Sequence, residues 1–127
     1  MSSIAMLIGR VLLSLIFIQA GLSKLMNVSG TIAYFEGLGL PLASLLIWLV
    51  VLVELVGGLL LLTGFYIRIA AAVLAAFCIA TAFTGHSDWA NVMDFQAFMK
   101  DIAIAGGLLY VAAAGAGLIS FDTRRGV

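Results

Sequence analysis

The stretch VVLVELVGG, residues 50–58, places a single glutamate, Glu54, inside a run that is otherwise apolar. Between Glu36 and Arg68 the chain carries no other charged residue. An ionisable side chain in such a run is expensive in lipid, and it is expected to have either a partner or a function. Which solvent surrounds this segment follows from the composition of the whole chain.

The composition is that of a membrane protein. The chain has 127 residues, of which 65% are hydrophobic and 9% are charged, against roughly 45–50% and about 25% in soluble globular proteins. A soluble core of one domain could not bury so much apolar surface, so the bilayer is the expected solvent and partner. The net charge is zero and no basic run is present, so nucleic acid is not an expected partner. The one cysteine, Cys78, allows no intrachain disulfide and no multi-cysteine metal or iron–sulfur site.

Four segments are long and apolar enough to cross a bilayer, which takes about 20 helical residues. They lie at roughly 4–24, 42–63, 66–84 and 98–119, separated by the polar stretches 25–41 and 85–97 and by the short turn TGFY at 63–66. The first segment has no basic residue ahead of its apolar run, and Arg10 interrupts it, so it is expected to be a retained span and not a signal peptide. The sequence therefore predicts a single membrane domain, residues 1–127, that is all-α and forms an antiparallel bundle of four transmembrane helices.

The distribution of charge predicts the orientation. An even number of spans puts both termini on one side, and that side carries the arginines, at positions 10, 68, 124 and 125. The opposite side carries Lys24 and Lys100 together with most of the acidic residues. By the positive-inside rule both termini are expected in the cytoplasm. In a bacterium the corresponding location is the inner membrane.

Small residues share helical stripes with the polar ones and are expected to mark the faces that touch. In the fourth span this stripe contains Lys100, Ala103, Gly107, Tyr110, Ala114 and Gly117. In the second span, Gly57 and Gly58 are expected to let the first or third span approach closely enough for Arg10 or Arg68 to reach Glu54. The sequence thus predicts a compact bundle with a polar seam inside it.

Arg10 is the expected partner of Glu54. Glu54 lies nine residues from the inner end of the second span, and Arg10 lies six residues into the first, which correspond to depths of about 14 Å and about 9 Å. Arg68 lies nearer the surface and either snorkels or joins the pair. Three interpretations of this predicted intramembrane charge pair are open: it fixes the helix register, it relays protons or polarises a ligand, or Glu54 is neutral and faces another subunit.

A second group of polar residues is expected at the outer rim. It contains Lys24, His86, Asp88, Lys100 and Asp101. His86 follows the third span directly, and its candidate roles are proton carrier, metal ligand, donor to a quinone headgroup, or a plain helix cap at the interface. One histidine among scattered carboxylates is not a recognised metal-ligand spacing, so no metal site is predicted. Cys78, in the middle of a span, is expected to serve packing alone.

Several segments together resemble the DoxX family of small membrane proteins. They are GRVLLSLIFIQAGLSKL, GLPLASLLIWLVVLVELVGGLLLLTGFYIRIAA, TAFTGHSDW and FQAFMKDIAIAGGLLY, and they cover nearly the whole chain in the family's order. The resemblance is to bacterial inner-membrane members with an HS-[DN]-[WF] loop after the third span. It places Arg10, Lys24, Glu54, Arg68, His86, Lys100 and Asp101 at motif positions of the family.

The resemblance implies an accessory role in redox processes. The family's namesake is a membrane subunit associated with a thiosulfate:quinone oxidoreductase, and other members are linked to oxidative-stress and aromatic-compound responses. The expected function is therefore that of a subunit or accessory in quinone-linked or oxidative-stress processes. No intrinsic cofactor is expected, and a quinone is the candidate ligand. The candidate protein partner is a redox partner subunit or a second copy of the chain. A non-enzymatic membrane scaffold and a small carrier are the alternatives, and the sequence assigns no catalytic residue.

Overall fold

The computed structural model describes residues 2–117 and 119–124. Their regular structure is helical throughout, with α1 (Ser2–Met26), α2 (Val28–Gly37), α3 (Ala43–Thr63), α4 (Ile67–Gly85), α5 (Val92–Ala114) and α6 (Phe121–Arg124). Four of these helices, α1, α3, α4 and α5, are long and apolar enough to span a membrane. The predicted all-α fold with four transmembrane helices is confirmed.

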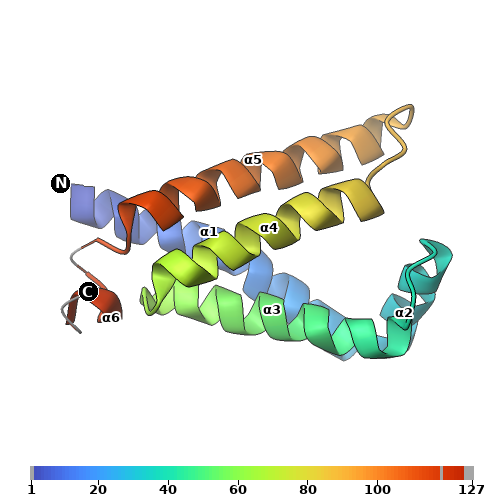
Figure 1. Ribbon diagram of the computed structural model, residues 1–127, viewed down its shortest axis with the longest axis horizontal. Helices are drawn as coiled ribbons and strands as arrows, with labels where there is room; N and C mark the ends of the chain where they lie inside the picture. The colour runs from blue at the N-terminus through green and yellow to red at the C-terminus, as the bar shows by residue number, and fades with distance from the viewer. Residues whose placement is uncertain (1, 118, 125–127) are drawn as a thin grey trace.

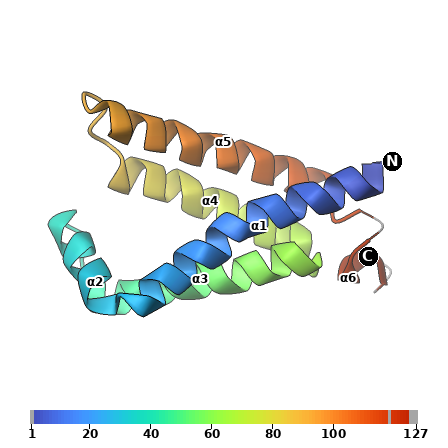
Figure 2. The same cartoon turned by 180° about the vertical axis from the view of Figure 1, so that it is seen from behind.

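The long helices form two antiparallel pairs, α1 with α3 and α4 with α5. Figures 1 and 2 show that both ends of the chain lie at one end of the molecule, where the pairs meet, and that the pairs diverge toward the other end. We call that other end, where α1 and α4 finish and α3 and α5 begin, the open end. The short helix α2 lies there beside α3 (Figure 1).

The two glycines of VVLVELVGG lie at the contacts of α3 with α1, its partner in the pair, and with α4 of the other pair. A Cβ atom added at Gly58 would lie 3.3 Å from the backbone nitrogen of Ile18 in α1, and one added at Gly57 would lie 2.8 Å from Cδ2 of Leu74 in α4. The two glycines therefore face different neighbours, and each lets its neighbour approach α3 closely. The expectation that Gly57 and Gly58 allow close approach is confirmed for both neighbouring helices.

The buried face of α5 is not the one expected from the stripe of small residues. Tyr110 of that stripe is 81% exposed, whereas Phe98, Ala105 and Leu108 are buried. The reason is that α5 packs mainly against α4, so only the side facing α4 is covered. The four helices form the predicted antiparallel bundle, but the prediction that this stripe of the fourth span lies in its interior was wrong.

The fourth span also begins earlier than predicted, at Val92 and not near residue 98, and it ends at Ala114. Its first turn is capped by Asn91, whose side-chain oxygen accepts hydrogen bonds from the backbone N–H groups of Met93 and Asp94 at 2.9 and 3.2 Å. This cap satisfies donors that a helix start otherwise leaves open. The helix therefore extends through a stretch that hydropathy alone assigns to the preceding loop.

Candidate functional site

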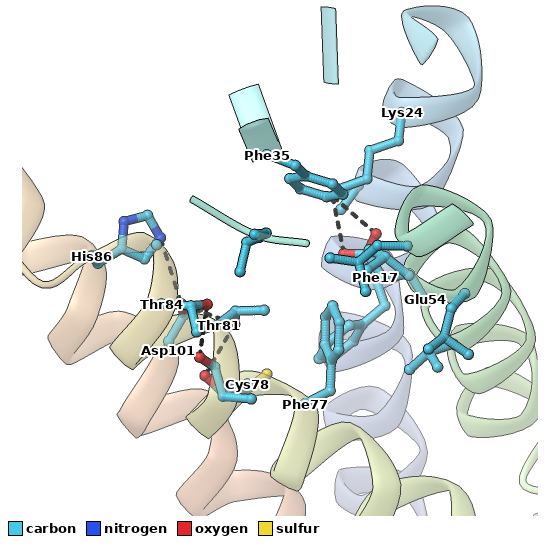
Figure 3. Close-up of a pocket in the computed structure, with 18 of the residues that line it drawn as sticks. Phe17, Lys24, Phe35, Glu54, Phe77, Cys78, Thr81, Thr84, His86 and Asp101 are labelled. Atoms are coloured by element: carbon cyan, nitrogen blue, oxygen red, sulfur yellow. Dashed lines mark hydrogen bonds and ion pairs between the residues drawn. The ribbon is translucent and has the colours of Figure 1, made fainter. Parts of the chain in front are cut away.

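A cavity of about 530 Å³ lies between the two helix pairs on the side of the open end. All of the helices α1 to α5 contribute to its wall, which is mainly apolar. Figure 3 shows the aromatic rings of Phe17, Phe35 and Phe77 on this wall. A volume of this size lies within the range of small-molecule sites in proteins, roughly 300–1,000 Å³.

Lys24 and Glu54 form an ion pair at one side of the cavity. Nζ of Lys24 lies 2.9 Å from Oε1 of Glu54, and it donates a hydrogen bond to Oε2 at 3.2 Å. Lys24 comes from the last turn of α1 and Glu54 from the middle of α3, and both residues line the cavity. The carboxylate that is isolated in the sequence is thus paired with a cation at the wall of a cavity (Figure 3).

The expected pairing of Glu54 with Arg10 is therefore wrong, and Arg68 does not join it either. Arg10 donates a hydrogen bond from Nη2 to the carbonyl oxygen of Ile119 at 2.8 Å. Nη1 of Arg68 donates to the carbonyl oxygens of Ala112 and Ala113 at 3.1 and 2.5 Å. Both arginines lie at the end where the helix pairs meet, and they bind backbone carbonyls near the end of α5 and beyond it.

The register of α1 against α3 explains the change of partner. A Cβ atom added at Gly21 would lie 3.5 Å from Cβ of Glu54, so Gly21 is level with the glutamate. Lys24 is one turn beyond Gly21, whereas Arg10 is eleven residues before it, or about 16 Å along the helix at 1.5 Å per residue. Lys24 can reach back to Glu54, and Arg10 is too far away.

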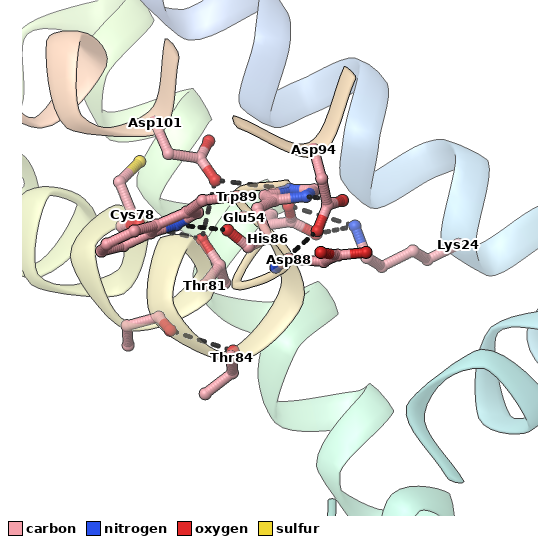
Figure 4. Close-up of polar contacts among 11 residues, drawn as sticks. Lys24, Glu54, Cys78, Thr81, Thr84, His86, Asp88, Trp89, Asp94 and Asp101 are labelled. Atoms are coloured by element: carbon pink, nitrogen blue, oxygen red, sulfur yellow. Dashed lines mark hydrogen bonds and ion pairs between the residues drawn. The ribbon is translucent and has the colours of Figure 1, made fainter. Parts of the chain in front are cut away.

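His86 and Asp101 form the polar group on the opposite side of the cavity. Nε2 of His86 lies 3.6 Å from Oδ2 of Asp101, and Nδ1 lies 3.6 Å from Oδ1 of Asp94. Oγ1 of Thr81 donates to Oδ2 of Asp101 at 3.5 Å. His86, Asp101 and Thr81 line the cavity, whereas Asp94 lies outside its wall. Figure 4 shows these contacts around His86.

The loop before α5 positions His86. The indole Nε1 of Trp89 donates to the carbonyl oxygen of His86 at 3.2 Å, and the backbone N–H of Asp88 donates to Oδ2 of Asp94 at 3.0 Å. The Trp89 ring packs against Phe98 with centroids 5.0 Å apart. These contacts tie the loop to the first turns of α5, so the imidazole is held between two carboxylates of that helix.

The predicted outer-rim cluster is divided by the structure. Lys24, His86 and Asp101 reach the cavity, whereas Asp88 and Lys100 do not line it. The sequence did not predict Thr81 as a member of this site. Thr81 could have been found from its helical spacing, since it lies one turn after Cys78, which also lines the cavity.

Over residues 2–117 and 119–124, the histidine, cysteine and acidic side chains form no group of three or more that could hold a metal ion. Lys24 and His86 supply donors, while Glu54 and Asp101 supply acceptors.

The sequence model of the DoxX family matches residues 5–87. The chain belongs to the DoxX family. The matched range holds Lys24, Glu54 and His86, and it ends before Asp101. No solved structure matches the chain.

Two relatives are inner membrane proteins of Escherichia coli (strain K12). YqjF is 38% identical over 122 residues, covering 96% of this chain and 92% of its own length. YphA is 34% identical over 126 residues, covering 95% of this chain and 90% of its own length. With four helices able to span a bilayer, this DoxX-family chain is a multi-pass inner-membrane protein in contact with lipid.

A third relative comes from Bacillus subtilis (strain 168) and carries the name "Putative oxidoreductase CatD". It is 36% identical over 81 residues, which cover 64% of this chain and 59% of the relative.

Proposed function

We propose that the cavity binds the headgroup of a membrane quinone and that the protein acts as an accessory subunit of a quinone-linked redox system. The observation that carries this proposal is the cavity itself, with an apolar wall and two polar groups from different helices, Lys24–Glu54 and His86–Asp101. A quinone headgroup is a flat apolar ring with carbonyl acceptors on opposite edges, which this arrangement matches.

The donors of the site suit carbonyl oxygens. An ammonium group has three N–H donors, and the Lys24–Glu54 pair, in which both carboxylate oxygens are near Nζ, leaves the lysine a donor for a ligand. On the other side of the cavity, the His86–Asp101 pair can supply a donor to the second carbonyl oxygen. Aromatic side chains on the wall, among them Phe35 and Phe77, can pack against a ring in offset or edge-to-face geometry.

The composition supports the accessory character of the proposed function. One cysteine in the chain cannot form an intrachain dithiol couple. In this proposal a redox partner in or at the membrane supplies the electrons that reduce the bound quinone. The name of the Bacillus relative, "Putative oxidoreductase CatD", is consistent with this assignment.

A binding titration tests the proposal. Purified protein in lipid nanodiscs is titrated with short-chain ubiquinone and menaquinone analogues, and the affinity is measured by calorimetry. Lys24→Met and His86→Ala are expected to weaken binding about tenfold each, which is the loss of one hydrogen bond of about 1.4 kcal/mol. Lys100→Met and Asp88→Asn are the matched controls, because both residues lie outside the cavity wall.

The outcomes separate the candidate functions. Saturable binding that is weakened by the cavity variants and unchanged by the controls supports the proposal. Absence of saturable binding to the wild-type protein overturns it and favours a membrane scaffold. Uptake of the analogue across proteoliposomes, lost in the same variants, would indicate a small carrier instead.

A further inference from the structure

The imidazole of His86 bridges two carboxylates with different surroundings. Nδ1 faces Asp94, which lies outside the cavity in the first turn of α5, and Nε2 faces Asp101, which lines the cavity two turns further along. Each separation is 3.6 Å, so a closure of about 0.5 Å brings either pair to ordinary hydrogen-bonding distance. The two ring nitrogens thus point to the two sides of the cavity wall.

We propose that the series Asp94–His86–Asp101 is a proton path from the aqueous phase at the open end into the cavity. Imidazole suits this task, because it accepts a proton on one nitrogen and releases it from the other near neutral pH. Oγ1 of Thr81 lies 3.5 Å from Oδ2 of Asp101 at the inner end of the path, while its shorter hydrogen bond goes to the carbonyl oxygen of Cys78 at 3.0 Å. His86 is the only histidine of the chain, so no other imidazole can replace it.

The inference rests on the proposed function and deepens it by naming the source of a proton. Reduction of a quinone to its quinol takes two electrons, which come from the redox partner, and two protons. As each C=O bond becomes a single C–O bond, its oxygen forms a new O–H bond. The proton for the oxygen on the His86 side passes from water to Asp94, His86 and Asp101 in turn. The oxygen on the other side takes its proton from Nζ of Lys24, which regains one from water.

The charged groups around the path come from several helices. Asp88 precedes α5, and its backbone N–H donates to Asp94. Lys100 is adjacent to Asp101 in the chain and lies outside the cavity. The Lys24–Glu54 pair faces the cavity from α1 and α3. Because Lys24 and Glu54 neutralise each other, the carboxylates of Asp94 and Asp101 are the charges that act most directly on His86.

The test follows protonation separately from binding. A short-chain quinone is bound to the protein in nanodiscs, electrons are added by pulse radiolysis, and the optical spectrum reports how fast the reduced quinone gains its protons. His86→Gln and Asp101→Asn are expected to slow protonation on this side about 100-fold, the size of a typical general acid–base contribution. Asp88→Asn is the matched control and is expected to keep the wild-type rate. Added imidazole should restore the rate in His86→Gly, which a merely structural role of His86 would not allow.

A second measurement uses the empty protein. Nitrogen-15 labelling of histidine gives signals from His86 alone, since the chain has no other histidine. Asp94→Asn is expected to shift the Nδ1 resonance and Asp101→Asn the Nε2 resonance, while Asp88→Asn shifts neither by a comparable amount.

The two proposals fail in different ways. If the wild-type protein binds quinone and protonation keeps its rate in His86→Gln and Asp101→Asn, the path is overturned and the quinone site stands. If both carboxylate variants leave the His86 resonances in place, the path is overturned whatever the protein binds. If the wild-type protein binds no quinone, the proposed function and the delivery of protons to it are overturned together.

Discussion

Loss of Lys24 is expected to destabilise the protein more than loss of Glu54, although the two residues form one ion pair. The side chain of Glu54 is 6% exposed, whereas that of Lys24 is 24% exposed and comes from the last turn of α1. In Lys24→Met the carboxylate stays buried beside an apolar side chain. In Glu54→Leu the lysine can extend its ammonium group toward the interface.

The structure gives the magnitudes. Removing one partner of a buried pair costs about 3–5 kcal/mol when the other stays buried and charged, and the near-complete burial of Glu54 places Lys24→Met at about 3 kcal/mol. The partly exposed Lys24 can regain hydration, so Glu54→Leu is expected to cost about 1 kcal/mol. The double variant leaves no charge behind and is expected within about 1 kcal/mol of wild type.

The assay is reversible unfolding in mixed micelles, followed by circular dichroism as the fraction of denaturing detergent rises. Lys100→Met is the matched control, because this lysine is exposed and lies outside the cavity, and its unfolding free energy should equal that of wild type. A Lys24→Met cost no larger than that of Lys100→Met, or a larger cost for Glu54→Leu, would refute the reasoning from burial.

Three further predictions concern the end where the helix pairs meet. Gly64→Ala should cost more than about 2 kcal/mol of unfolding free energy in the same assay, because Gly64 has φ +72° and an added Cβ would clash with Arg10. Gly106→Ala is the control, because an added Cβ at Gly106 meets open space. Its unfolding free energy should equal that of wild type or rise by up to about 1 kcal/mol. Asp122→Ala should cost about 1–2 kcal/mol, since its carboxylate accepts the backbone N–H groups that begin α4 at 2.7 and 2.8 Å, and an unchanged midpoint would contradict this. Fusion of reporters to the carboxyl terminus should give a fluorescent green fluorescent protein and an inactive alkaline phosphatase, as the positive-inside rule predicts; the reverse pattern would place the termini outside.

Hydropathy was sufficient to find the four spans, because a bilayer requires a long apolar helix wherever the chain crosses it, but it did not give the bounds of the fourth. The second predicted span, 42–63, differs from α3 (Ala43–Thr63) by a single residue. The glycine pair at 57 and 58 also indicated close helix contacts correctly. The absence of a side chain lets a neighbouring helix approach, whichever of its residues lie level with the glycines.

The partner of Glu54 could not be predicted from depth alone. Counting residues from the predicted span ends put Arg10 nearly level with Glu54, but helix ends do not have to lie at a common depth. The contact between Gly21 and Glu54 sets the actual register, and it brings Lys24 within reach. Which residues of two antiparallel helices are level depends on packing that a single sequence does not display.

Helix α2 was missed because its polar residues suggested a loop. Its apolar residues Val28, Ile32 and Phe35 nevertheless recur at helical spacing. They pack together near Ile47 and Val51 of α3. A shorter window for periodicity would have found this helix, which contributes Tyr34 and Phe35 to the cavity wall.

The junction of the helix pairs has a mechanical consequence. The backbone N–H of Asp122 donates to the carbonyl oxygen of Gly64, which lies between α3 and α4, and Arg10 of α1 binds the carbonyl oxygen of Ile119, beyond α5. These bonds connect the two helix pairs at one end of the molecule, and the cavity lies between the pairs toward the other end. Because the helix pairs diverge from this junction, a small change in the angle between them there would change the width of the cavity, although none of the junction residues lines its wall.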